Sequence, residues 1–405
     1  MKQKLFHDGD ILTPVQGGLS LSHGKRVAKE VLLLCTTSGI SQARKEQISR
    51  TLAGTIDWKY LLELARLHEV LPLISYNILN NDFTDHVPEP YKEQMEKIYY
   101  STLFRNVLLS SELANVLSRF SQNGIAVISL KGTVLAEMLY GNPGMRTTSD
   151  TDIIVQPEVL SRARSLLLEM GYTQSKSPEP WEHPFHEEPY RKQSIFPMSI
   201  ELHWDLDDSR FVSVSKEEIW RRARPLHLQW GSPVVLSPED TLLFLSIQLI
   251  DHCIPLKLLG DITELLKKYQ DALDWDYILK SAYSWGVNTV LYCALRKAKD
   301  LLEAPVSTLS LNTLKPGAWR WRLVNFLIND KIIISPMKKS KLRDKTFSVA
   351  RSLMMKHFFR TLSILTRTHS LRKNPVKGTR VWITPLIVLV FSTALVRNVA
   401  RFVSG

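Results

Sequence analysis

Hydrophobic residues recur at helical spacing along the front of the chain. Between residues 26 and 123, apolar positions return every three or four residues, as in Trp58–Leu67, and the stretch Tyr91–Phe120 has the pattern of a long helix pair. Residues 1–25 are polar and contain glycines, so we expect them to be poorly ordered. The pattern therefore predicts a disordered N-terminus at 1–25 and a helical region at 26–123.

The middle of the chain, residues 124–236, alternates short apolar runs with helical segments. Ile125–Leu130 lies between two glycines and has the composition of a buried strand, and Asp152–Val155 is a second run rich in β-branched residues. Other elements expected here are helices at Thr133–Tyr140 and Glu158–Met170, a surface loop at 175–190, and strands at about 190–196 and 199–205. This mixture predicts an α+β fold with a small mixed β-sheet and flanking helices, preceded and followed by helical regions.

Helical spacing returns after residue 236 and weakens beyond Pro305. The sequence Ser237-Pro238-Glu239-Asp240 precedes an apolar run and has the form of a capping box with Pro in the first turn, so a helix should begin there. We therefore expect a helical bundle at 237–305 and a tail at 306–405.

The positive charge of the chain is concentrated in this tail. The formal net charge is +12, and from Lys338 onward there are fifteen Lys and Arg residues and one acidic residue, so the rest of the chain is close to neutral. An uncharged apolar segment at 381–396 would rise roughly 24 Å as a helix, against about 30 Å for a bilayer core, and Pro385 interrupts it. Two interpretations stay open: residues 338–405 contact an anionic membrane surface, or the apolar segment packs on the protein as a helix.

Cysteine usage and the N-terminus indicate the compartment. Cys35, Cys253 and Cys293 are odd in number, far apart and without metal-ligand spacing, as in proteins of reducing compartments. The first fourteen residues lack the apolar core of an export signal. We expect a cytoplasmic protein that could lie peripherally at the inner face of the membrane, and no DNA partner, because aromatic residues for base stacking are sparse in the tail.

The candidate chemistry rests on three acidic residues. Asp150 and Asp152 are two positions apart at the head of a predicted strand, so period-two alternation puts both carboxylates on one side. Glu201 stands among apolar neighbours in another predicted strand. Carboxylates that converge from adjacent strands would suit a hard divalent cation, whereas an isolated Asp-x-Asp is usually a solvated turn. Convergence of the three groups is the deciding expectation.

The surrounding motifs resemble a known family. Leu130-Lys131-Gly132, Tyr140-Gly141, Arg146 and Asp150–Val155 are similar to the core of nucleotidyltransferases related to DNA polymerase β, and more narrowly to the bacterial family known as uncharacterised nucleotidyltransferases. Further stretches that carry the resemblance, over roughly residues 30–305, are Trp58–Pro72, Ile200–Trp204, Ser237–Asp240, His252 and Lys257–Asp261.

The resemblance implies an enzyme that moves a nucleoside monophosphate from an NTP, with ATP favoured, to an unidentified acceptor and releases pyrophosphate. It implies that Asp150, Asp152 and Glu201 are catalytic and ligate Mg²⁺, with Mn²⁺ as the alternative, and that Glu201 activates the acceptor hydroxyl. The residues implied to contact the nucleotide are Lys131, Gly132, Thr133, Arg146, Ser149 and Lys257. His203, His252 and Asp261 would support this site from behind.

Several of these residues also have structural interpretations. Lys131 and Arg146 could instead form salt bridges to Asp150 or Asp152, and Lys257 and Asp261 are four apart, as in a pair on one helix face. Lys131-Gly132 stands where the superfamily usually has two small residues, so the phosphate-binding turn departs from the pattern. A group of potential ligands at His183, His186, Glu187 and Glu188 is interpreted as part of the surface loop.

Two other functions are consistent with the same sequence. A non-catalytic nucleotide-binding or regulatory module would keep the fold but lack turnover, which the altered glycine motif favours. A membrane-attached interaction protein, in which the central acids are incidental, is favoured by the basic tail.

Overall fold

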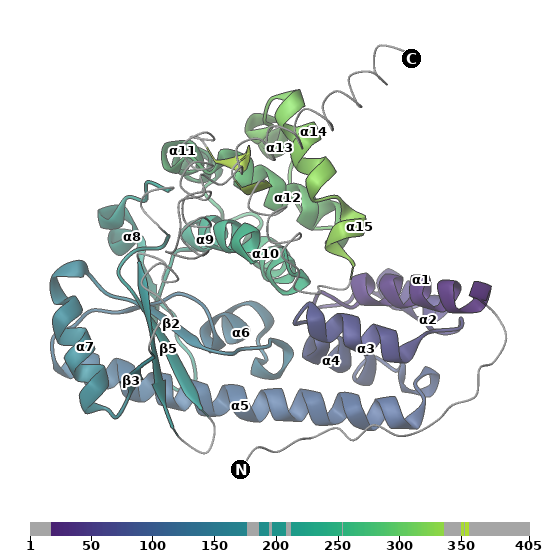
Figure 1. The fold of residues 1–405 in the computed structure, drawn as a ribbon, viewed down its shortest axis with the longest axis horizontal. Coiled ribbons are helices and arrows are strands. Elements are labelled where there is room, and N and C mark those ends of the chain that lie inside the picture. Colours follow the sequence, from purple (N-terminus) through teal and green to yellow (C-terminus); the bar gives the residue numbers. More distant parts are fainter. Residues whose placement is uncertain are drawn as a thin grey trace, which may run out of the picture.

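The strands form one mixed β-sheet in the order β3-β4-β5-β2-β1-β7-β6. Figure 1 labels β2, β3 and β5 of this sheet. The computed structural model describes residues 18–175, 186–193, 197–207, 212–252, 254–335, 350–351 and 353–355. The strands are β1 Ile128–Ser129, β2 Thr151–Ile154, β3 Thr173–Gln174, β4 Glu187–Lys192, β5 Met198–His203, β6 Arg224–Pro225 and β7 Val234–Val235. The expected α+β fold with a small mixed sheet is confirmed.

The register of the central strands determines which side chains share a face. β2 is parallel to β5, with Asp152 opposite Glu201, and antiparallel to β1. The next residue on each strand, Ile153 on β2 and Leu202 on β5, has a fully buried apolar side chain. One face of the strand pair therefore belongs to the core. Because side chains alternate along a strand, the acidic residues lie together on the other face.

The front of the chain consists of helices. They are α1 Gly18–Leu34, α2 Gln42–Leu52, α3 Trp58–Leu67, α4 Leu71–Leu79, the short 3-10 helix Thr84–His86 and α5 Glu89–Gln122. The predicted helix pair at Tyr91–Phe120 is wrong: α5 is one helix of 34 residues, since no Gly or Pro interrupts it after Pro90. It runs beneath both the front helices and the sheet (Figure 1).

The N-terminal boundary also differs from the prediction. Helix α1 begins at Gly18, so the last part of the segment expected to be poorly ordered is helical. Part of this segment also contacts the rest of the fold, since the carbonyl oxygen of Gly24 accepts a hydrogen bond of 3.4 Å from the Asp57 amide at the start of α3. Local composition does not reveal such a contact.

Helices and short 3-10 turns connect the strands. They are α6 Thr133–Tyr140, the 3-10 helices Pro143–Met145 and Pro157–Val159, α7 Leu160–Glu169 and α8 Lys216–Arg222. The surface loop predicted at 175–190 is wrong at its end, where β4 begins at Glu187 and pairs with β5 along its whole length. The backbone pairing with β5 outweighs the polar composition of this segment.

The C-terminal bundle begins as predicted. In α9 (Pro238–Asp251), the hydroxyl of the N-cap residue Ser237 accepts a hydrogen bond of 3.1 Å from the Asp240 amide. The following helices are α10 Leu256–Tyr269, α11 Trp275–Trp285, α12 Asn288–Leu302, α13 Thr308–Leu314, α14 Ala318–Leu327 and α15 Asp330–Ile333. The helical region therefore continues beyond residue 305, where the sequence pattern weakened. Apolar contacts such as the fully buried Leu314 hold these extra helices.

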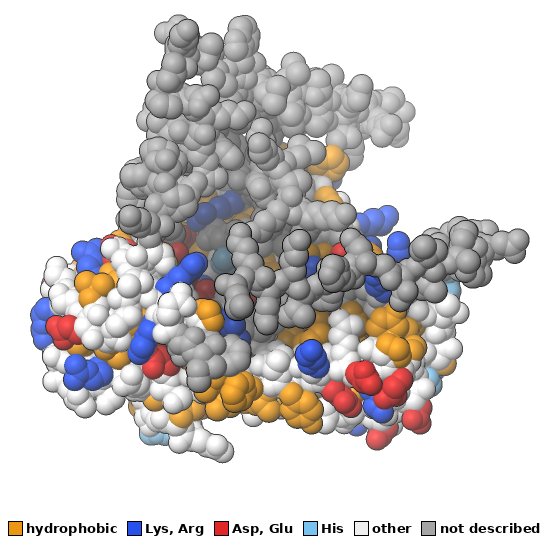
Figure 2. Space-filling model, turned by 60° about the horizontal axis from the view of Figure 1, so that its bottom comes forward, with side chains coloured by type: hydrophobic (Ala, Val, Ile, Leu, Met, Phe, Trp, Pro, Cys, Tyr) orange, Lys and Arg blue, Asp and Glu red, His pale blue; other side chains and the backbone are white. Residues whose placement is uncertain are grey.

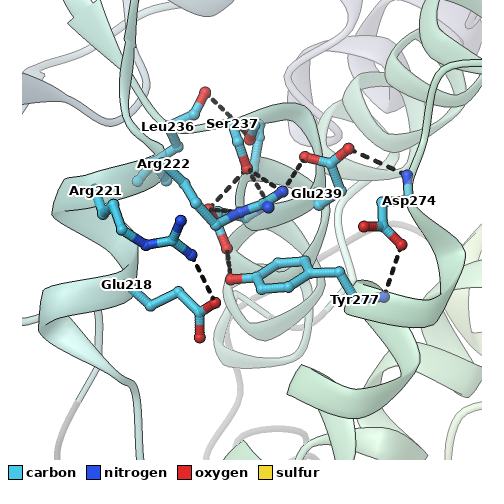
Figure 3. Close-up of polar contacts among 10 residues, drawn as sticks. Glu218, Arg221, Arg222, Leu236, Ser237, Glu239, Asp274 and Tyr277 are labelled. Carbon is cyan, nitrogen blue, oxygen red and sulfur yellow. Dashed lines mark hydrogen bonds and ion pairs between the residues drawn. The ribbon is translucent and has the colours of Figure 1, made fainter.

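A polar cluster joins α8 to the bundle (Figure 3). The Arg222 guanidinium donates to Glu239 at 2.6 Å and to Asp240 at 3.3 Å, and its central carbon lies 3.7 Å from the centre of the Tyr277 ring. Tyr277 in turn donates to Asp240 at 2.6 Å. These contacts attach the sheet region to α9 and α11.

Two surface features complete the description. Tyr100, Phe104 and Val107 of α5 are at least half exposed, and Figure 2 shows apolar areas among charged side chains on the side of the molecule that faces down in Figure 1. None of the described helices combines the length and the hydropathy that a bilayer span requires. The apolar segment at 381–396 lies outside the described residues.

Candidate active site

Asp152 on β2 and Glu201 on β5 form the centre of the candidate site. They are direct partners in the parallel register; Asp152 is fully buried, and the Glu201 side chain is 25% exposed. His203, two residues after Glu201, places Nε2 3.3 Å from Oδ1 of Asp152 and 4.0 Å from Oε2 of Glu201. One donor atom from each of the three residues lies within 4.8 Å of the others, so the group could hold a metal ion.

The second carboxylate oxygen of Asp152 is an orphan. Within the described part of the chain, its Oδ2 is buried and accepts no hydrogen bond. An unsatisfied buried carboxylate oxygen carries a desolvation cost, which a bound cation would offset. This oxygen fits a metal ligand.

The pKa values of the Glu201 and Asp152 carboxyl groups are shifted in opposite directions. Burial and the negative charge of Asp152 raise the pKa of Glu201 to about 9. Burial acts in the same direction on Asp152, but the Lys131 ammonium and the His203 ring outweigh it and hold the pKa of Asp152 well below its usual range. Two carboxylates this close share a proton unless a cation neutralises them.

Lys131 supplies part of that neutralisation. Its Nζ lies 2.9 Å from Oδ1 of Asp152 and 3.8 Å from Oε2 of Glu201. Although burial opposes the charged form, the neighbouring carboxylates raise the pKa of Lys131. The salt-bridge interpretation of Lys131 is the one that the structure shows.

Asp150 lies beside this group rather than in it. It immediately precedes β2 and is half-buried, and its negative charge contributes to the raised pKa values of Lys131 and Glu201. Burial and the charge of Asp152 raise the pKa of Asp150 as well. Its donor atoms are not among those gathered around Asp152, so metal ligation by Asp150 stays a prediction.

The turn at Gly132 brings the start of α6 against the β2 strand. Gly132 has a φ of +80°, and a Cβ atom there would lie 3.0 Å from the carbonyl oxygen of Asp150. Both observations require glycine at this position. Thr133, the first residue of α6, is fully buried, and its hydroxyl forms no hydrogen bond within the described residues.

Arg146 is engaged in a buried ion pair with Asp261 of α10. Its Nε and Nη2 donate to the Asp261 carboxylate at 2.9–3.1 Å, and its Nη1 donates to the Gly132 carbonyl oxygen at 3.2 Å. The Tyr140 hydroxyl also donates to Asp261, at 2.9 Å. The Arg146 side chain is 4% exposed and fixes the Gly132 turn. Its expected contact with a triphosphate stays a prediction.

Lys257 and His252 also have partners other than those expected. Lys257 forms an ion pair with Glu69, in the turn between α3 and α4, and not with Asp261, because Asp261 faces Arg146. His252 follows α9 as an exposed residue whose Nε2 lies 3.1 Å from the side-chain oxygen of Gln248.

Two residues of α5 support the loop before β2, and sequence reasoning missed both. Asn106 donates to the carbonyl oxygens of Pro143 and Arg146 at 2.5 and 2.8 Å. Arg105 donates to those of Thr148 and Ser149 at 3.2 Å. Nothing in the local pattern of α5 marks these residues, since their partners are about forty positions away.

His186 and Glu187 were also missed as site residues. They were assigned to a surface loop, but the β4–β5 register places Glu187 opposite His203. Oε2 of Glu187 lies 3.2 Å from Nδ1 of His203 and 3.6 Å from Nε2 of His186. His183, which the sequence analysis grouped with these two residues, lies outside the described residues.

A comparison with curated proteins gives no match. Residues 54–303, more than half of the chain, match the family described as "uncharacterised nucleotidyltransferase". The match covers α3 to α12 with the whole sheet, and therefore every residue of the Asp152 group. On this ground, the chain belongs to the family of uncharacterised nucleotidyltransferases.

Proposed function

We propose that this protein transfers a nucleoside monophosphate from an NTP, with ATP favoured, to an acceptor hydroxyl or similar nucleophile and releases pyrophosphate. The observation that carries the proposal is the pairing of Asp152 with Glu201, in which a buried carboxylate oxygen of Asp152 has no donor among the described residues. A relation to the polymerase β superfamily is part of the proposal.

The donor set suits Mg²⁺ or Mn²⁺. Asp152 and Glu201 would hold the ion, and Asp150, which lies beside them, is the third carboxylate that the resemblance implies. Hard divalent cations prefer oxygen ligands, and a bound ion would supply charge neutralisation for the phosphates and polarisation of the attacking oxygen.

The remaining residues would bind substrate and move a proton. Lys131 is within reach of the same carboxylates and would exchange that contact for a phosphate oxygen. The backbone amides at the start of α6 would bind another phosphate group, which can approach them because Gly132 has no side chain. Glu201 would activate the acceptor hydroxyl, as the resemblance implies. A bound cation beside Asp152 would lower its raised pKa and so favour the ionised carboxylate that this role needs.

Transfer of label from an α-labelled NTP in the presence of Mg²⁺ tests this proposal. We expect Asp152→Asn and Glu201→Gln to lower the rate by at least about 100-fold, the scale of a lost acid–base or electrostatic group. Glu188→Gln is the matched control, because Glu188 is next to Glu187 on β4 and pairs with Arg164 away from the site. Undiminished transfer by both site variants, with folding confirmed by circular dichroism, would refute the assignment.

A non-catalytic nucleotide-binding module is the second candidate, and the Lys131 contact favours it. An ammonium group that already neutralises Asp152 could stabilise the fold without turnover. Metal-dependent NTP binding without pyrophosphate release would support this alternative. Contact of residues 338–405 with anionic membranes, whether or not the protein is an enzyme, stays a prediction that vesicle co-sedimentation can test.

A further inference from the structure

A second group of ligands lies on the far side of His203 from Asp152. His186, Glu187 and His203 each offer one donor atom, and the three atoms lie within 4.8 Å of one another. The same oxygen, Oε2 of Glu187, is 3.2 Å from Nδ1 of His203 and 3.6 Å from Nε2 of His186. For a tetrahedral ion with bonds of about 2.0–2.1 Å, ligand atoms stand roughly 3.3–3.4 Å apart. The two distances from Glu187 are close to that spacing.

The Nδ1 atom of His203, on the side of Glu187, is a buried polar atom without a hydrogen bond among the described residues. His203 is fully buried, and despite the short distance to Glu187, its Nδ1 forms no hydrogen bond within the part of the chain that the structure describes. When Nε2 carries the proton shared with Asp152, Nδ1 turns a lone pair toward a carboxylate oxygen. A cation between these two electron-rich atoms would satisfy both.

The second ring nitrogen and the backbone complete the arrangement. Metal-binding histidines usually donate their other N–H to a carboxylate, and Nε2 of His203 lies 3.3 Å from Asp152. Glu187 and His203 are held opposite each other on paired strands, and His186, directly before β4, accepts a hydrogen bond of 2.9 Å at its carbonyl oxygen from the Trp204 amide. Rigid strands position ligands better than loops do.

We propose that His186, Glu187 and His203 bind a borderline divalent cation of the Zn²⁺ type, with an open position for water. Two nitrogens and one carboxylate oxygen select such ions over Mg²⁺, which prefers oxygen. The ion would lie on the Nδ1 side of His203, and the pair of Asp152 and Glu201 lies on its Nε2 side. The proposal does not depend on nucleotidyl transfer. The Glu187 side chain is 20% exposed, so the ion has access from solvent.

Zn²⁺ titration of the metal-free, full-length protein by calorimetry tests the proposal, with Co²⁺ absorption as a report on tetrahedral nitrogen and oxygen ligation. We expect one Zn²⁺ per chain and a loss of affinity of at least about tenfold in His186→Ala and in the isosteric Glu187→Gln. Glu188→Gln, the neighbouring carboxylate that pairs with Arg164, should bind as the wild type does. Millimolar Mg²⁺ should not displace the Zn²⁺.

Glu201→Gln separates the two sites. We expect it to retain Zn²⁺ binding, whatever its effect on nucleotidyl transfer. The proposal is overturned if Glu187→Gln, folded by circular dichroism, binds Zn²⁺ as tightly as the wild type. It is equally overturned if only Glu201→Gln loses the ion, which would assign Zn²⁺ to the acidic pair.

Discussion

At the residue scale, Lys131 balances part of the negative charge of Asp152 and Glu201 when no metal is bound. Its ammonium lies between Asp152 and Glu201 and is itself 15% exposed, while Asp152 is fully buried. A buried ion pair is weak evidence for net stability, but removal of one partner leaves the other charge uncompensated. Lys131 and a divalent cation therefore compete for the same carboxylate charge.

Lys131→Met should lower the free energy of unfolding by about 3 kcal/mol in the presence of EDTA, the lower end of the cost of breaking a buried pair. Mn²⁺ should restore part of this loss, because it neutralises the same oxygens. Chemical denaturation with and without Mn²⁺ measures both effects. Lys257→Met is the control: its partner Glu69 is 47% exposed, so the loss should stay below about 1 kcal/mol. Equal losses in the two variants would contradict the interpretation.

Glu201 should make the metal-free protein less stable as pH rises. Its folded pKa is about 9, against an ordinary value of 4.5, so the folded state keeps a proton that the unfolded state releases in this window. The free energy of unfolding must then fall with increasing pH between about 5 and 9. The lowered pKa of Asp152 acts only in acid, below this window.

Melting temperatures in EDTA at pH 5.5 and pH 8.5 test this expectation. Glu201→Gln cannot ionise, so its decrease over this range should be smaller than that of the wild type, while Glu188→Gln should behave as the wild type does. The same decrease in all three proteins would show that Glu201 is not the group that titrates.

The sequence predicts residues of this site only where its pattern is local. Local apolar patterns placed Asp152 and Glu201 each in a strand, whereas their convergence was an expectation; the structure has them opposite each other. The partner of Arg146 could not be found in this way, because Asp261 lies 115 residues further along the chain. His186 and Glu187 were missed since their polar segment gives no strand signal until β5 is placed beside it.

At the scale of elements, the prediction is best for helix α6 and poorer for the first strand. Helix α6 has the predicted bounds, Thr133–Tyr140, because Gly132 and Gly141 both adopt positive φ and flank it. The first strand is much shorter than Ile125–Leu130, since only Ile128 and Ser129 have register partners on β2. Apolar runs mark burial, and pairing then decides how much of a run is strand.

Helix α10 is connected to the Gly132 turn by one ion pair. Asp261→Asn should lower the free energy of unfolding by about 3–5 kcal/mol, because Arg146 would be left buried with a charge that an amide does not balance. Asp300→Asn on α12 is the matched control: it also breaks an arginine pair, but Arg296 is 45% exposed, and the loss should be below about 1 kcal/mol. Urea denaturation compares the two, and similar losses would mean that the buried pair does not hold α10.

At the scale of the molecule, the front helices and the bundle form one body. The Ser38 amide and hydroxyl both donate to Glu264 of α10, at 2.9 and 2.5 Å, and the Lys257 amide donates to the His68 carbonyl oxygen at 3.2 Å. The front third also supplies Glu69 as the ion-pair partner of Lys257. Contacts across almost two hundred positions leave no trace in a local pattern.

We therefore expect the front helices, the sheet and the bundle to unfold together. Tryptophan fluorescence and far-ultraviolet circular dichroism should give coincident urea transitions for the full chain. Glu264→Gln should move both curves by the same amount, whereas a shift in only one of them would reveal domains that unfold independently.

Helix α5 has a consequence for how this fold can change in length. Over 34 residues it rises roughly 51 Å, with Tyr99 against Tyr76 of α4 and Asn106 under the loop before β2. One residue added between Tyr99 and Asn106 would turn one half by about 100° relative to the other. The two halves of α5 must therefore keep a constant relative rotation about the helix axis. Natural insertions should be confined to the connecting loops.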